Sequence, residues 1–133
     1  MIKNEISRVN TVDILELEKN AKKNECYIVN IQGGNIQTKK SFLELMTEKF
    51  LLPDSTSTGW DSFTDWMTDL SWIDNPCFCI IIKDYTDFLK KDIESKEIVM
   101  EIFKEDILPF WENGVTQTVV EGKPRSFKVY LVK

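Results

Sequence analysis

The apolar run Cys77-Phe78-Cys79-Ile80-Ile81-Ile82 decides the fold class of this chain. Apolar and polar side chains do not alternate along it, as they would in a strand with one solvated face. A run of this kind is typical of a central strand in a parallel sheet, which helices cover on both faces. We therefore expect an α/β protein in which residues 77–82 form a buried strand.

Two further strands are expected before and after this run. Residues 26–31 are a compact β-prone segment, and the glycine-containing residues 32–35 close it as a turn. Toward the C-terminus, residues 115–120 are predicted to be an extended arm, 121–124 a turn and 127–132 the last strand. Because strands and helices alternate along the chain, the sheet is expected to be small and largely parallel.

Four segments show the spacing of apolar residues that is typical of amphipathic helices. A hydroxyl side chain or a polar stretch precedes each of them and can cap its first turn. Pro53 and Pro109 are expected to end or kink the helices before them, and Asn113-Gly114 to stop the last segment. The predicted helices are residues 11–23 with Thr11 as cap, 38–51 with Thr38 as cap, a helix that follows the polar residues 55–59 and runs through Leu70, and about 95–108 with Ser95 as cap.

Length and composition favour a single domain. A chain of 133 residues with 42% apolar content can bury enough surface to fold alone. We expect residues 1–133 to be one domain, with residues 1–12 as a flexible lead. No apolar run of signal-peptide length follows the N-terminus, and none approaches the roughly 20 residues of a membrane span. The sequence therefore predicts a cytoplasmic protein without membrane contact.

Charge and the absence of histidine argue against several classes of function. The formal net charge of −5 has the wrong sign for a protein that binds nucleic acid by neutralising phosphates. Because the chain has no histidine, it lacks Ser-His and Cys-His catalytic pairs and the common zinc sites. We predict no catalytic residue, no metal and no cofactor, and expect that the protein is not an enzyme.

The three cysteines are expected to be reduced and structural. Cys26, Cys77 and Cys79 are odd in number, and the last two share one face of the apolar strand, where they would pack as small hydrophobic side chains. Cytoplasmic proteins rarely carry disulfides. We therefore expect three free thiols that are dispensable for activity.

Carboxylates are concentrated in and around the third predicted helix. From Leu51 to Ile82 the only charged residues are Asp54, Asp61, Asp65, Asp69 and Asp74. At about 100° per residue, Asp61, Asp65 and Asp69 fall within roughly 80° of one another, and the apolar residues of the helix gather on the opposite side. The sequence therefore predicts one buried face and one acidic face.

An acidic face can simply keep a surface helix solvated, but this one has a cost. Like charges at i, i+4 destabilise a helix by a few tenths of a kcal/mol per pair, and alternating Glu and Lys would serve solubility better. We therefore predict that the aspartate row binds a cationic surface of a protein partner. A metal site is the rival interpretation, although three aspartates at successive i+4 steps do not converge on one ion.

The same part of the sequence resembles a known family. Leu52-Pro53-Asp54 and Gly59-Trp60-Asp61-Ser62-Phe63-Thr64-Asp65-Trp66-Met67-Thr68-Asp69-Leu70-Ser71-Trp72 resemble the signature of the barstar-like ribonuclease inhibitors. The order of the predicted elements is similar to that of the family over about residues 13–133. The resemblance implies a three-stranded parallel sheet flanked by helices, with an extra helix at the N-terminus.

The resemblance also implies an inhibitor that occludes the active site of a bacterial ribonuclease with this helix and the loop before it. Asp61 and Asp65 would be the main contacts to Arg and Lys groups of the enzyme, with Thr64 between them and Glu105 as a peripheral charge. Carried over by position, the partner-binding residues would be Asp61, Asp65, Thr64, Gly59, Thr58 and Glu105, to which helical geometry adds Asp69.

Three functional hypotheses remain open. The first is an inhibitor or immunity protein, monomeric when free, that neutralises a basic ribonuclease or a related nuclease toxin. The second is an adaptor or regulator that has lost ribonuclease binding, because residues 55–58 lack the aromatic side chains that the family's loop usually offers. The third is a carboxylate-dependent hydrolase, which needs a concave site that the sequence does not show.

Overall fold

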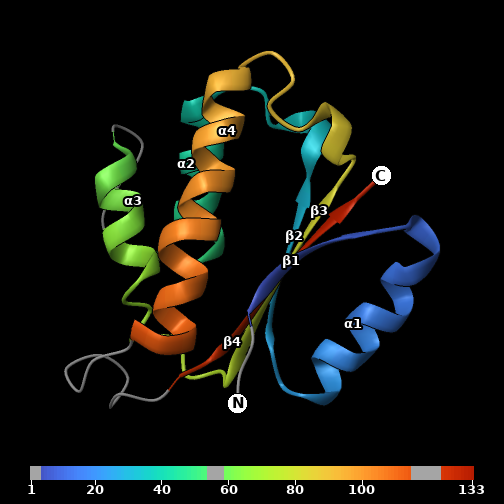
Figure 1. The fold of residues 1–133 in the computed structure, drawn as a ribbon, viewed down its shortest axis with the longest axis vertical. Coiled ribbons are helices and arrows are strands. Elements are labelled where there is room, and N and C mark those ends of the chain that lie inside the picture. Colours follow the sequence, from blue (N-terminus) through green and yellow to red (C-terminus); the bar gives the residue numbers. More distant parts are fainter. Residues whose placement is uncertain (1–3, 54–58, 115–123) are drawn as a thin grey trace.

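A four-stranded parallel sheet forms the centre of the computed structural model, which describes residues 4–53, 59–114 and 124–133 (Figure 1). Its strands lie in the order β1-β4-β3-β2. The six residues from Cys77 to Ile82 are all buried in β3, which lies between β4 and β2 and therefore confirms the predicted central strand. The strands are β1 Glu5–Val9, β2 Tyr27–Gln32, β3 Cys77–Lys83 and β4 Ser126–Val132.

Strand β1 corrects two expectations, the number of strands and the flexible lead over residues 1–12. Residues 5–9 pair with β4 in parallel, from Glu5 opposite Lys128 to Val9 opposite Val132. Asn4 fixes the start of this pair, because its side-chain oxygen accepts the Phe127 backbone N–H at 2.8 Å. β1 is an edge strand with no fully buried residue, so it lacks the apolar run that identified β3.

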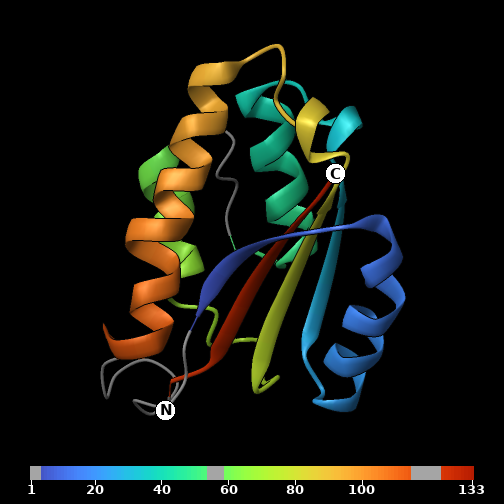
Figure 2. The ribbon, with the colours of Figure 1, turned by 45° about the vertical axis from the view of Figure 1, so that its right-hand side comes forward.

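Helices cover both faces of the sheet, as expected (Figures 1 and 2). α1 (Ile14–Lys23) lies on one face, over a small core that contains Ala21, Cys79, Ile81 and Val132. α2 (Lys39–Lys49), α3 (Trp60–Met67) and α4 (Ile93–Ile102) lie on the other face, over the main core. Short 3-10 turns connect the elements at Thr11–Asp13, Gly33–Asn35 and Tyr85–Asp87.

Helix α2 follows the sequence prediction. The Thr38 hydroxyl accepts the backbone N–H of Ser41 at 3.0 Å and so caps the first turn. Phe42, Met46 and Phe50 are all fully buried, as their spacing predicted. This stripe is one wall of the main core.

Helix α4 begins earlier than predicted, and the helical path that follows it continues through Pro109 as far as Gly114. Its cap is Asp92 and not Ser95, since the Asp92 carboxylate accepts the Ser95 backbone N–H at 3.1 Å. Beyond α4 the chain stays helical through two π-helical segments, Phe103–Ile107 and Phe110–Gly114. A proline ring crowds the carbonyl four residues before it, which is that of Glu105 here, and the wider π turn around Glu105 can relieve that contact.

Cys26 and Cys77 form a disulfide, so the prediction of three reduced thiols is wrong for this pair. β2 and β3 pair with Tyr27 opposite Phe78, which brings the two preceding residues, both cysteines, side by side. The sequence predicted both strands but not their register, and the register determines which cysteines can form a disulfide. Cys79 is the free cysteine and is buried.

Some predicted features lie outside the described residues. These are the arm at residues 115–120, the turn up to residue 123 and residues 54–58, which include Thr58. Within the described segments, no helix is long and apolar enough to cross a membrane.

Candidate protein-binding groove

Helix α3 has one buried and one exposed side, as its sequence predicted. Phe63 and Met67 are fully buried, and the Phe63 ring lies 5.5 Å from that of Phe42 between ring centroids. Asp61 and Asp65 are exposed on the other side of the helix. The helix is therefore anchored through its aromatic side and presents its carboxylates outward.

Asp69 is not part of this helical row, which corrects the predicted row of three aspartates. α3 ends at Met67, two residues before Asp69, and was predicted to run through Leu70. Leu70 is fully buried but has a left-handed backbone conformation with φ 47°, which ends the helical path. The Asp69 carboxylate instead accepts the Ser71 backbone N–H at 3.2 Å in the turn that follows.

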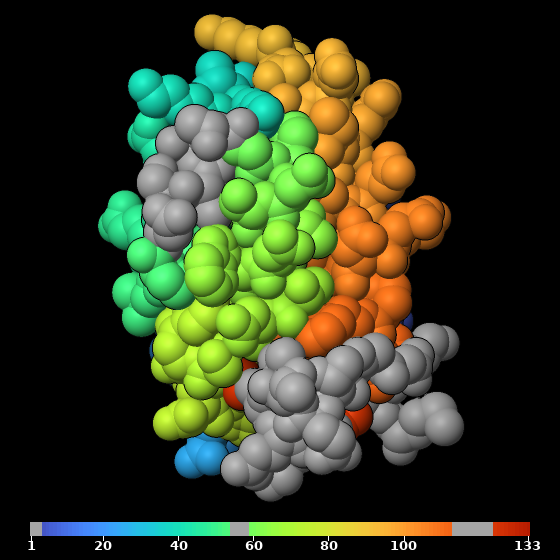
Figure 3. All heavy atoms as spheres, turned by 90° about the vertical axis from the view of Figure 1, so that its left-hand side faces the viewer, coloured from blue at the N-terminus to red at the C-terminus, as the bar shows by residue number. Residues whose placement is uncertain are grey.

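A groove of about 650 Å³ separates α3 from α4 and the first π-helical segment. Figure 3 shows this face of the molecule, with α3 in green beside α4 in orange. We call this cavity the carboxylate groove, because Asp61 and Asp65 line one wall and Glu101 and Asp106 the other. Its remaining lining residues are Trp60, Thr64, Ile98 and Ile102.

The carboxylate groove is strongly acidic. None of its four carboxylates forms an ion pair with another described residue, and no Lys or Arg is among the described residues that line it. Ile102 is only 7% exposed and Ile98 is half-buried, so an apolar strip runs between the charged side chains. The groove can therefore accept a side chain with an apolar stem and a cationic end, such as Arg or Lys.

The π-helical segment determines which carboxylates of the second wall face the groove. In a continuous α-helix, Glu105 would lie one turn after Glu101, on the same face. The π turns of Phe103–Ile107 add about one residue per turn, and Asp106, not Glu105, lines the groove. Glu101 and Asp106 were not among the predicted site residues, because Glu105 was carried over from the family resemblance and nothing in the sequence indicates a π turn or which face of α4 lies opposite α3.

Three side-chain donors hold the backbone that leads into and out of α3. Trp111 Nε1 donates to the carbonyl of Met67 at 2.9 Å, and Arg125 Nη1 donates to that of Ile73 at 2.7 Å. Trp72 Nε1 donates to the carbonyl at residue 50, also at 2.9 Å. These bonds satisfy carbonyls in an otherwise irregular connection and fix the end of α3 relative to the sheet.

Arg125 is buried, and its guanidinium group also packs against two aromatic rings. Its guanidinium carbon lies 5.3 Å from the ring centroid of Phe78 and 5.2 Å from that of Trp111. Burial lowers the pKa of Arg125, and the negative charge of Asp74 opposes that shift. A planar guanidinium suits this position, because it can stack on the rings and donate in its own plane.

The predicted partner-binding residues are thus only partly brought together. Asp61, Thr64 and Asp65 line the carboxylate groove, and Gly59 occupies the cap position just before α3. Asp69 and Glu105 are not among the residues that line it.

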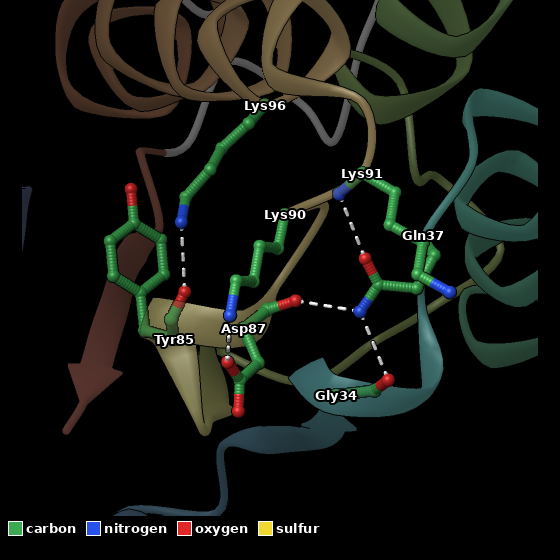
Figure 4. Close-up of polar contacts among 7 residues, drawn as sticks. All are labelled: Gly34, Gln37, Tyr85, Asp87, Lys90, Lys91 and Lys96. Atoms are coloured by element: carbon green, nitrogen blue, oxygen red, sulfur yellow. Dashed lines mark hydrogen bonds and ion pairs between the residues drawn. The ribbon is translucent and has the colours of Figure 1, made fainter.

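A second polar cluster lies at the carboxyl ends of the strands, where open α/β sheets commonly bind ligands (Figure 4). Gln37 Nε2 donates to the carbonyls of Gly34 at 3.0 Å and Asp87 at 2.7 Å, and its Oε1 accepts the Lys91 backbone N–H at 3.1 Å. Gln37 therefore joins three loops and uses its polar atoms in doing so. This arrangement favours a structural cap over the end of the sheet.

Tyr85 and Lys96 complete that cap. Lys96 Nζ donates to the Tyr85 carbonyl at 2.9 Å and lies 4.3 Å from the centroid of its ring (Figure 4). Burial lowers the pKa of Lys96, with a further lowering from the charge of Arg8 and an opposing effect from Asp87. Among the described residues, no group of three or more His, Cys, Asp or Glu side chains is arranged to hold a metal ion.

Comparison with known proteins identifies one family. Residues 26–131 match the family model described as Barstar (barnase inhibitor). The matched region begins at Cys26 and contains β2, β3 and both walls of the carboxylate groove, whereas β1 and α1 precede it. A search of curated proteins returned no match to the chain.

Proposed function

The chain belongs to the barstar family, and from this premise we propose that it binds and neutralises a basic ribonuclease or a related nuclease toxin by covering the active site with its carboxylate groove. The observation that carries the proposal is the set of four carboxylates around an apolar strip, none of which forms an ion pair with a described residue. A nuclease active site is cationic because it binds phosphates. The carboxylates would take the place of those phosphates.

The two walls of the groove would contact the cationic groups of the enzyme from opposite sides. Asp61 and Asp65 are the main contacts to Arg and Lys groups of the enzyme, with Thr64 between them. Glu101 and Asp106 approach the same cations from the other side. Asp69 and Glu105 add peripheral charge, and Gly59 and Thr58 belong to the loop before α3 that meets the rim of the active site.

The protein acts by occlusion, without catalysis and without a cofactor, as a monomer in the cytoplasm. The negative charge of the groove accelerates encounter with a basic partner by electrostatic steering. Affinity should therefore fall with ionic strength mainly through a slower association rate.

The experiment begins with identification of the partner by co-purification from the native cell and mass spectrometry. Association and dissociation rates are then measured by stopped flow across ionic strength for Asp61→Asn, Asp65→Asn, Glu101→Gln and Asp106→Asn. Truncating a buried, hydrogen-bonded charge pair typically costs about 2 to 5 kcal/mol, a range that includes the best-studied complex of this same family. The matched control is Glu16→Gln, an exposed carboxylate on α1, on the other face of the sheet.

A second comparison tests the geometry of the groove itself. Asp106→Asn should weaken binding more than Glu105→Gln, because only Asp106 lines the groove. If none of the groove variants differed from Glu16→Gln, the carboxylates would be a solvated face. The adaptor hypothesis, which the polar residues 55–58 favour, would then replace inhibition.

A further inference from the structure

All three cysteines line one pocket between α1 and the sheet, away from the carboxylate groove. The pocket has a volume of about 350 Å³, and exposed Asn20 is part of its rim. Cys26 and Cys77 are joined there by the disulfide, and Cys79 lies two residues further along β3. The sulfur atoms are therefore next to a cavity that a small thiol reagent can reach.

Helix α1 and the residues next to it, which we call the α1 layer, make few contacts with the rest of the molecule apart from this disulfide. α1 covers the small core, whereas α2, α3 and α4 share the much larger main core. Val12 and Leu15, at the start of the α1 layer, are 85% and 82% exposed. At its end, Asn75 Nδ2 donates to the carbonyl of Glu25 at 2.9 Å, and the disulfide is the covalent tie beside it.

The disulfide also closes a long segment of the chain. Its cysteines are 51 residues apart, and the enclosed segment contains α2 and α3. Cross-linking a loop of this length removes conformations mainly from the unfolded chain, which stabilises the folded one. The bond therefore acts on the stability of both the α1 layer and the groove-bearing segment.

We propose that Cys26 and Cys77 are a redox switch, which low-molecular-weight disulfides close and dithiols open, and which sets the stability of the fold. In the cytoplasm, where we place the protein, disulfides are mostly transient or redox-sensing. The chain keeps its sheet in both states, because β2 and β3 pair from Tyr27 and Phe78 onward without the bond.

The reaction is a two-electron thiol–disulfide exchange. The Cys26 thiolate, which is the more accessible because Cys26 is half-buried and Cys77 only 7% exposed, attacks one sulfur of a small disulfide and releases the first thiol. The Cys77 thiolate then attacks the Cys26 sulfur of the mixed disulfide and releases the second thiol. Each leaving group departs as a thiolate, and the two thiolates take up the two protons lost by the cysteines. A dithiol reverses both steps and is itself oxidised to a disulfide.

Cys79 does not compete for either partner. It is 3% exposed, and burial, with a smaller contribution from the charge of Glu18, raises the pKa of its thiol to about 11. At neutral pH the thiol is therefore protonated and a poor nucleophile. This protects the neighbouring disulfide from internal exchange and keeps the pairing unique.

The test equilibrates the full chain in buffers with graded ratios of reduced to oxidised glutathione, followed by acid quenching, alkylation and mass spectrometry. Cys26 and Cys77 should gain and lose their thiols together, and Cys79 should remain a thiol throughout. The midpoint of thermal unfolding should be at least about 5 °C higher in the oxidised chain. Hydrogen exchange should show larger protection changes in α1 than in β3.

Two variants separate the switch from a general effect of the buffer. Cys26→Ser should show one unfolding midpoint in all buffers, whereas Cys79→Ala should keep the difference between oxidised and reduced forms even if both midpoints fall. The main comparison is between the oxidised and the reduced wild-type chain, so the test does not depend on the folding of either variant. A disulfide that contains Cys79, failure of the pair to oxidise, or equal midpoints in both states would overturn the proposal.

Discussion

At the scale of single residues, Gly33 shows most directly how backbone packing restricts the sequence. A Cβ atom at this position would lie 2.4 Å from the carbonyl oxygen of Lys83 and 2.7 Å from that of Asp84. Both contacts are shorter than van der Waals distance, and the atoms that would have to move belong to the backbone. The close approach joins the ends of β2 and β3, so only glycine fits there.

We predict that Gly33→Ala lowers the free energy of unfolding by about 1 to 3 kcal/mol, because the added methyl group overpacks a site that cannot expand. Gly34→Ala is the matched control. A Cβ atom at Gly34 would have the Cβ of Asp87 as its nearest neighbour, at 4.0 Å, which is an ordinary contact. Chemical denaturation of both variants is the measurement. Equal losses in the two variants would contradict a specific steric cause.

At the scale of elements, α3 combines an anchoring side and a binding side. We predict that Phe63→Ala costs about 3 to 5 kcal/mol, because the fully buried ring leaves a cavity in the main core. Asp65→Ala should be close to neutral or slightly stabilising, since it removes repulsion with Asp61 one turn before. Chemical denaturation ranks the two variants, and the opposite ranking would show that the helix faces the other way.

The N-terminus of α4 makes stability depend on pH. Hydrogen bonds from the Ser95 hydroxyl at 2.7 Å and then from its backbone N–H lower the pKa of the Asp92 carboxyl. Because the pKa is lower in the folded state than in the unfolded state, the stabilisation is present above the ordinary aspartate pKa of 3.8 and is lost as the pH falls through the folded value. The cap therefore acts at neutral pH and fails in acid.

We predict that Asp92→Ala lowers the unfolding free energy at pH 7 by about 0.5 to 2 kcal/mol, as is typical for loss of an N-cap. The difference from wild type should shrink as the pH falls below 3.8, because the wild-type carboxyl is then increasingly protonated. Urea denaturation at a series of pH values measures this. Glu97→Ala, at an exposed position within the same helix, is the comparison carboxylate. A gap that stayed constant down to pH 2 would rule out the charged cap.

At the scale of the whole molecule, β1 and α1 precede the region that matches the family and complete the sheet on one edge and one face. We predict that deletion of residues 1–10 destabilises the chain and promotes self-association. The reason is that β4 loses one of its two parallel partners and the bond from Phe127 to Asn4, and then becomes an exposed edge strand. Denaturation and analytical ultracentrifugation measure the two effects.

The control for this deletion is Val12→Ser, which alters a side chain that is 85% exposed and lies outside the sheet. It should leave both stability and association state unchanged. A truncated chain that remained monomeric and as stable as wild type would show that β1 is a dispensable addition.

Local patterns in the sequence were sufficient for the central strand, the cap and buried stripe of α2, and the two sides of α3. Each of these depends on residues within a few turns or one strand, where periodicity and capping chemistry dominate. The family resemblance rested on the same stretch and is confirmed by the match over residues 26–131. Asp61 and Asp65 were predicted as site residues from their helical spacing and from the family resemblance, and Thr64 from the resemblance alone.

Only the tertiary structure decided the remaining features, because each depends on segments that are distant in the sequence or on a local departure from regular geometry. β1 is a short edge strand whose place comes from pairing with β4, and the Cys26–Cys77 bond follows from the register of β2 on β3. The second wall of the carboxylate groove depends on a π turn that brings Asp106 to face α3. Residue periodicity carries no information on register or on an inserted π turn, since both are set by the packing of whole elements.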